Sequence, residues 1–127
     1  MQVTEKVNWH KIKESDLKSA LLVTRGAAFR DLNLLDEAEN CAMQAMECQP
    51  DSHQPYTLMG AISFDRREYD EGESWFEMAA ERGADDIDDE IERIVRMTKD
   101  RDKRREAAEY LLNKDPNHYE WAKSYLK

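Results

Sequence analysis

Apolar residues recur along this chain at intervals of three and four, which is the spacing of one face of an α-helix. The first unit shows two such faces, formed by Leu22, Gly26 and Phe29 and then by Ala38, Ala42 and Ala45. Asp31-Leu32-Asn33 lies between them as a turn signal, and Pro50 ends the second run. Residues 19–52 are therefore predicted to form a helical hairpin.

The same pattern returns 34 residues further along the chain. At that shift Leu22 falls on Tyr56, Gly26 on Gly60, Leu35 on Tyr69 and Ala45 on Ala79. Pro55 suits the first turn of a helix, and Gly83 suits the position just after a helix ends. A second hairpin is predicted over 53–87, with its second helix running from Tyr69 to Arg82.

Two glycines of these units fall in the middle of predicted helices, at Gly26 and Gly60. Glycine at such a position costs about 1 kcal/mol relative to alanine. Because the cost recurs at the same place in both units, it indicates a packing requirement. We expect a partner helix to lie too close to each glycine for a larger side chain.

The third unit, over 88–115, is degenerate. Its apolar residues follow those of the second unit at a shift of 35, with Val95 in place of the glycine. Since no Gly or Pro interrupts Lys99 to Arg105, one continuous helix over 88–114 is an alternative to a hairpin.

The two ends of the chain are predicted to cover the helical stack. Asp115-Pro116 suits the start of a capping helix over 116–127. Residues 1–18 are harder to interpret: their apolar residues either form a short helix over the other end or belong to a longer parent chain. These residues are Val7, Trp9 and Ile12.

These features together resemble the tetratricopeptide repeat, a helix–turn–helix unit of about 34 residues. The first unit matches through Leu22, Gly26, Phe29, Ala38, Ala45 and Pro50, and the second through Tyr56, Gly60, Tyr69, Phe76 and Ala79. The resemblance implies an all-α fold, in which antiparallel helical hairpins stack as an α-solenoid with terminal capping helices. Residues 1–127 would then form one domain.

Charge and composition exclude several classes of protein. Lys and Arg number 19 against 28 Asp and Glu, so the formal charge is −9 and disfavours binding to nucleic acid. No apolar run is long enough to span a membrane. Two cysteines and no signal-like start indicate a reducing compartment, so we expect a cytoplasmic protein.

No motif for chemistry is evident. The three histidines stand far apart, and the acidic run 85–90 lacks the alternating ligands of a calcium loop. Cys41 and Cys48 form no Cys-x-x-Cys pair. There is no phosphate-binding glycine loop and no catalytic triad, so we expect neither an enzyme nor a bound metal or cofactor. The basic stretch 99–105 is either a solvated connector or a patch for phosphate or an acidic partner.

The resemblance also implies a concave groove, formed by the first helix of each repeat, that binds a partner. The matching positions are Val23, Ala27, Arg30 and Asp31, then Thr57, Ala61, Phe64 and Asp65, and then Glu92, Arg96 and Lys99. Phe64 is the candidate aromatic anchor. Any of these residues could instead belong to a solvated inner face without a ligand.

We therefore predict a non-catalytic protein–protein interaction module that acts as an adaptor, scaffold or co-chaperone. Its partner would be an extended peptide or a helix of another protein. One family subgroup clamps the C-terminal carboxylate of heat-shock chaperones, but only Arg96 fits that clamp. The alternatives are a small acidic secretion-type chaperone for apolar client segments and an accessory domain of a larger enzyme. The oligomeric state stays open.

Overall fold

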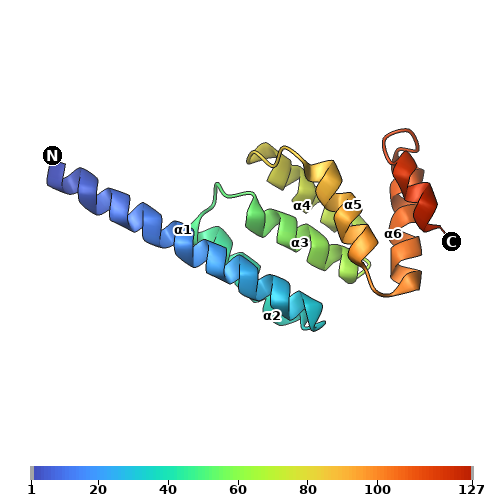
Figure 1. The fold of residues 1–127 in the computed structure, drawn as a ribbon, viewed down its shortest axis with the longest axis horizontal. Helices are drawn as coiled ribbons and strands as arrows, with labels where there is room; N and C mark the ends of the chain where they lie inside the picture. Colours follow the sequence, from blue (N-terminus) through green and yellow to red (C-terminus); the bar gives the residue numbers. More distant parts are fainter. Residues whose placement is uncertain (1, 127) are drawn as a thin grey trace.

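The computed structural model describes the backbone of residues 2–126 and the side chains of residues 14–126. Over this range the chain is helical without strands, which confirms the predicted all-α class (Figure 1). The elements are α1 (Gln2–Asp31), α2 (Leu35–Cys48), α3 (Gln54–Asp65), α4 (Tyr69–Glu81), α5 (Ile87–Met97), α6 (Arg101–Lys114) and the 3₁₀ helix η1 (Glu120–Tyr125).

Helices α1 and α2 form one antiparallel hairpin, and α3 and α4 form a second beside it (Figure 1). Both turns are built alike. Asn33 and Arg67, which are 34 residues apart, adopt left-handed backbone angles with φ of 61° and 65°. The next residue in each turn donates its N–H to a carbonyl five positions back, at 2.8 Å. The repeat seen in the sequence is therefore also present in the backbone, as the same helix-terminating turn.

The mid-helix glycines are sites of close helix packing, as predicted. A Cβ atom on Gly26 would lie 2.7 Å from Leu58 Cδ2, and one on Gly60 would overlap the ring of Phe76. The reverse contact occurs across the same hairpin, where a Cβ on Gly72 would lie 2.5 Å from the Phe64 ring. Each helix of the α3–α4 hairpin thus supplies a glycine for the other's phenylalanine.

Helix α3 is the most enclosed element of the described chain. Nine of its twelve residues are buried. Leu58, Met59 and Ile62 pack into a cluster with α2. Ala61 and Phe64 belong to a second cluster with α4, α5, α6 and η1. The two apolar cores therefore meet in this helix.

The N-terminal segment differs from the prediction. Residues 2–18 form no separate short helix, because α1 runs without a break from Gln2 to Asp31. No glycine or proline interrupts this stretch before Gly26. The predicted covering residues Val7, Trp9 and Ile12 lie outside the described side chains.

The third unit contains two helices, so the alternative of one helix over 88–114 is wrong. Helix α5 ends at Met97, and α6 begins at Arg101 after an extended connection. The Asp100 carboxylate caps α6 by accepting from the backbone N–H groups of Asp102 and Lys103, at 2.9 and 3.2 Å. An N-cap aspartate therefore breaks the helix where no glycine or proline does.

Aromatic and polar contacts fasten α6 to α4. Tyr69 and Tyr110 stack with ring centroids 5.5 Å apart. The Tyr110 hydroxyl lies within hydrogen-bonding reach of two carboxylates on α4, those of Asp70 and Glu73. Burial and these acceptors raise the pKa of Tyr110 well above its usual range, so the hydroxyl stays a donor.

The C-terminal segment packs on the core but begins later than predicted. A turn follows Asp115, whose carboxylate accepts from the N–H of His118 at 3.1 Å, and η1 starts only at Glu120. Tyr119 and Ala122 are buried in the second cluster. Proline at the second position of this turn supports its bend rather than a longer α-helix.

The turn before η1 is tied to α5 by an ion pair between His118 Nε2 and Asp88 Oδ1, 2.9 Å apart. The hydrogen bond and the charge of Asp88 raise the pKa of His118 above 6.5, and the charge of Asp115 acts in the same direction. A raised folded-state pKa means that the pair stabilises the protein fully below the unfolded-state value. The contribution is lost as the pH rises through the folded-state pKa.

His118→Gln should lower the free energy of unfolding. We expect this loss to be larger at about pH 5.5 than at about pH 9. Urea unfolding of both proteins at the two pH values measures this difference. A difference that does not change with pH would show that the pair contributes nothing through protonation.

Gly60→Leu should lower the free energy of unfolding by about 3 kcal/mol or more, because the added side chain must displace the Phe76 ring. For a chain of this length the melting temperature should fall by roughly 10 °C. Ala28→Leu, which enlarges an exposed position on α1, is the control and should leave the melting temperature nearly unchanged. Equal melting temperatures for Gly60→Leu and the control would contradict the close-packing argument.

Candidate binding groove

A groove of about 920 Å³ runs between α1 and α5, with α3 as its floor. The three helices run in roughly the same direction (Figure 1). Each contributes residues in the same pattern: Ala20, Val23, Thr24 and Ala27 from α1; Gln54, Thr57, Leu58 and Ala61 from α3; Glu90, Arg93, Ile94 and Met97 from α5. The groove surface is thus made by equivalent positions of three alternate helices, α1, α3 and α5.

Six of the predicted groove residues line this cavity. They are Val23, Ala27, Arg30, Asp31, Thr57 and Ala61. Asp65 does not line it but contacts Arg30 at its edge. The predicted residues of the first two units thus lie largely on one face of the structure.

The sequence prediction is wrong for the α5 side of the groove. None of Glu92, Arg96 and Lys99 lines the groove. The α5 residues that do so lie 36 positions after their α3 equivalents, whereas the predicted residues followed from a shift of 35. An error of one residue turns a helix by about 100°. The charged and polar residues of the α4–α5 connection gave no sign of the extra insertion.

Phe64 is a core residue and not a groove anchor. It is 4% exposed and meets Tyr69 and Phe76 edge to face, with ring centroids 5.1 and 5.4 Å apart. Its ring fills the space above Gly72. Truncation at this position would open a cavity in the core, so a loss of binding in Phe64→Ala would not locate a ligand.

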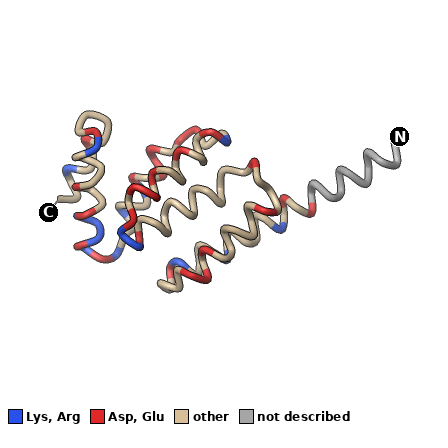
Figure 2. Tube along the Cα trace, turned by 180° about the vertical axis from the view of Figure 1, so that it is seen from behind, with Lys and Arg blue, Asp and Glu red and all other residues tan. Residues whose placement is uncertain are grey.

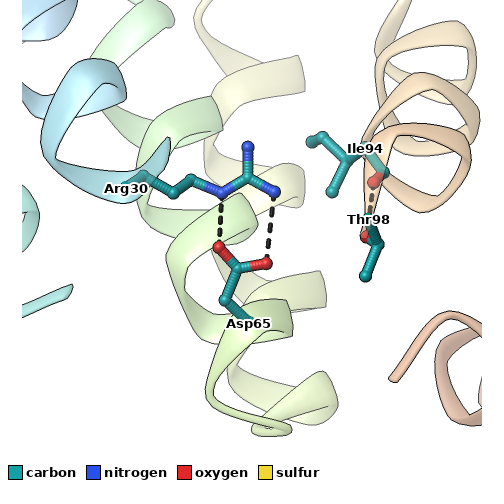
Figure 3. A network of polar contacts seen from close by, with 4 residues as sticks. All are labelled: Arg30, Asp65, Ile94 and Thr98. Atoms are coloured by element: carbon teal, nitrogen blue, oxygen red, sulfur yellow. Dashed lines mark hydrogen bonds and ion pairs between the residues drawn. The ribbon is translucent and has the colours of Figure 1, made fainter. Parts of the chain in front are cut away.

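An ion pair joins α1 to α3 at the edge of the groove. Arg30 Nε and Nη2 donate to the two carboxylate oxygens of Asp65 at 2.6 and 3.2 Å. The side chains are only 19% and 15% exposed. Figure 3 shows the guanidinium lying over Asp65 and reaching toward Ile94 on α5. The charge of Arg30 is therefore already matched within the chain, and Arg30→Glu would place two carboxylates together.

The charged residues around the groove are mostly acidic, with four carboxylates and two arginines. Asp85 and Asp86 line it from the α4–α5 connection, together with Glu90 in the first turn of α5. Arg93 also lines the groove, but it pairs with Glu90 at 3.5 Å. Acidic residues are dense along this part of the chain (Figure 2). The groove thus combines a lining of mostly small or apolar side chains with an anionic margin.

The sequence analysis missed the groove residues Gln54, Leu58, Ile94 and Met97 as well as the acidic margin. A signal for two of them was available, because Gln54 and Leu58 lie three residues before the predicted Thr57 and Ala61, on the same helix face. The α5 residues could not be identified from the sequence, because their register depends on how the preceding connection folds in space.

Two kinds of site are absent from the described residues. Among them no group of three or more His, Cys, Asp or Glu side chains could hold a metal ion. No helix in this part of the chain is long and apolar enough to cross a membrane. Every buried side-chain nitrogen or oxygen in the described region has a hydrogen-bond partner.

The chain matches no protein-family model, and no curated protein is significantly similar to it.

The Arg30–Asp65 pair should couple measurably in stability. In a double-mutant cycle with Arg30→Gln and Asp65→Asn we expect a coupling energy of about 1 to 3 kcal/mol, because both groups are largely shielded from water. The exposed pair Arg93–Glu90 is the control and should give about 0 to 0.5 kcal/mol. Additive effects at Arg30 and Asp65 would show that the pair does not hold α1 to α3.

Proposed function

We propose that this chain is a non-catalytic protein–protein interaction module of the tetratricopeptide type, an α-solenoid whose groove binds a peptide or helical segment of another protein. The observation that supports it most is the groove itself. Equivalent positions of the alternate helices α1, α3 and α5 line one continuous depression. Such a surface suits a chain segment, because a segment meets the same kind of position repeatedly along its length.

The groove offers space and apolar contact to a ligand. Ala20, Ala27 and Ala61 keep its walls and floor low, and Leu58 and Ile94 add larger apolar surface. The Arg30–Asp65 pair joins α1 to α3 in the absence of a ligand. A groove that is formed in advance binds with less loss of conformational entropy.

The anionic margin indicates which segments the groove favours. Asp85, Asp86 and Glu90 stand at one end, and only Arg93 offsets them there. Charge complementarity favours a segment with an apolar side flanked by Lys or Arg and disfavours acidic segments. This charge pattern also speaks against capture of a chaperone's C-terminal carboxylate.

A second candidate is a small acidic chaperone for apolar client segments. One observation favours it: Leu17 and Leu21 on α1 and Leu32 in the turn after it are 62%, 62% and 69% exposed. Leucines presented in this way can hold apolar segments of a client. The further alternative, an accessory domain of a larger enzyme, stays a prediction.

The groove can be tested with neighbouring residues of α1. Ala27 lines the groove, and Ala28 is exposed outside it. Ala27→Trp should fill the groove and weaken partner binding at least tenfold, whereas Ala28→Trp should bind like the wild type. An affinity capture from an extract of the source cell, analysed by mass spectrometry, identifies the partner, and calorimetry with the purified partner measures the affinities.

Charge reversal gives an independent test. Asp86→Lys should weaken binding of a basic segment, and Asp89→Lys, at an exposed position away from the groove, is its control. If the partner binds Ala27→Trp and Asp86→Lys as tightly as the wild type, the groove assignment is wrong. Loss of binding in Leu17→Ser and Leu21→Ser alone would favour the chaperone alternative.

A further inference from the structure

The charges of the chain are separated along its sequence. Residues 70–92 contain eleven acidic residues and one basic residue, Arg82. Residues 96–105 contain six of the 19 Lys and Arg residues and only two acidic ones. Figure 2 shows this basic stretch where α5 gives way to α6. The protein thus carries a basic region in spite of its acidic total.

A second hollow, of about 350 Å³, lies at this basic region. It is lined by Arg96 of α5, Arg104 of α6, and Ser124 and Tyr125 of η1. None of these residues lines the groove. The Arg104 guanidinium is fixed by a hydrogen bond from Nη1 to the Thr98 carbonyl oxygen, at 2.9 Å. The consecutive helices α5 and α6 therefore bring two arginines to the same hollow.

Four arginines of the described chain are paired with carboxylates, whereas others, among them Arg96 and Arg104, are not. Arg30, Arg66, Arg67 and Arg93 each lie within 4.0 Å of a carboxylate. Within the described part of the chain, neither Arg96 nor Arg104 forms such a pair, although acidic residues outnumber basic ones. Two like charges at one hollow repel each other, and an anion bound between them relieves the repulsion.

The chemistry of the hollow favours phosphate. Guanidinium groups donate in a planar fork that matches the oxygens of a phosphate. The Tyr125 hydroxyl can donate a further hydrogen bond, whereas the Ser124 hydroxyl already donates to the Trp121 carbonyl at 2.9 Å. The volume equals that of roughly ten water molecules. This is more than a bare phosphate fills, so there is room for the group that carries it.

We propose that the hollow between α5, α6 and η1 is a binding site for a phosphate monoester, with Arg96 and Arg104 as its main ligands. The phosphate belongs either to a free small molecule or to a phosphorylated side chain. This site is independent of the groove and of the proposed function, since it shares no residue with the groove.

Nuclear magnetic resonance titration tests the site on the whole chain. The probes are inorganic phosphate, O-phosphoserine and, as the uncharged control, serine, each at constant ionic strength. We expect saturable shifts of the Arg96 and Arg104 Nε–H signals and of the Ser124 and Tyr125 amides. The dissociation constant should be near or below about 1 mM.

Matched variants separate a site from a general charge effect. Arg96→Gln and Arg104→Gln should weaken binding at least tenfold. Arg105→Gln removes the same charge from an exposed neighbour outside the hollow and should change the affinity less than twofold. Since Arg104→Gln also removes the Thr98 contact, Arg96→Gln, at an exposed position, decides the case if Arg104→Gln unfolds.

The outcomes are distinguishable. Tighter binding of O-phosphoserine than of inorganic phosphate supports a phosphate monoester as the ligand, and equal or weaker binding of O-phosphoserine overturns the proposal. Shifts that do not saturate, or that Arg105→Gln reduces as much as Arg96→Gln does, overturn the proposal. Ala27→Trp should leave phosphate binding unchanged, so failure of the groove would not affect this result.

Discussion

The structure depends on the reciprocal contact between two phenylalanines and two glycines in the α3–α4 hairpin. The Phe76 ring lies over Gly60, and the Phe64 ring lies over Gly72. Each ring sits where a Cβ atom would otherwise stand, so the two backbones approach closely and each aromatic side chain is buried. This approach fixes α3 against α4 and turns the remaining face of α3, with Thr57 and Ala61, toward the groove. The groove floor is thus a consequence of core packing.

The groove itself combines features with different physical roles. Small side chains create its depth, the Arg30–Asp65 pair joins two of its helices, and the carboxylates of the α4–α5 connection give it a negative margin. The basic hollow at the other side of α5 has the opposite character. One short helix therefore separates two surfaces of opposite charge.

The sequence predicted those features that local chemistry determines. The 34-residue repeat, the close packing at Gly60 and the terminating role of Gly83, whose φ is +94°, follow from residues that few other positions accept. Burial of Phe64 did not follow, because an apolar residue in the last turn of a helix can face either a groove or a partner helix. The register of α5 depended on how the preceding connection folds in space. Asp100 was the missed signal for the break between α5 and α6.

Helix α3 belongs to both apolar clusters, with Leu58 and Ile62 in one and Ala61 and Phe64 in the other. The boundary between repeats in the sequence is therefore not a boundary between units that could exist alone. A fragment ending near Pro50 would expose the inner face of α2, and a fragment starting near Ser52 would expose one side of α3. Truncation at the repeat junction would thus produce two fragments with exposed apolar surfaces that tend to aggregate. The unit to transfer into another protein is therefore the whole set of elements from α1 to η1.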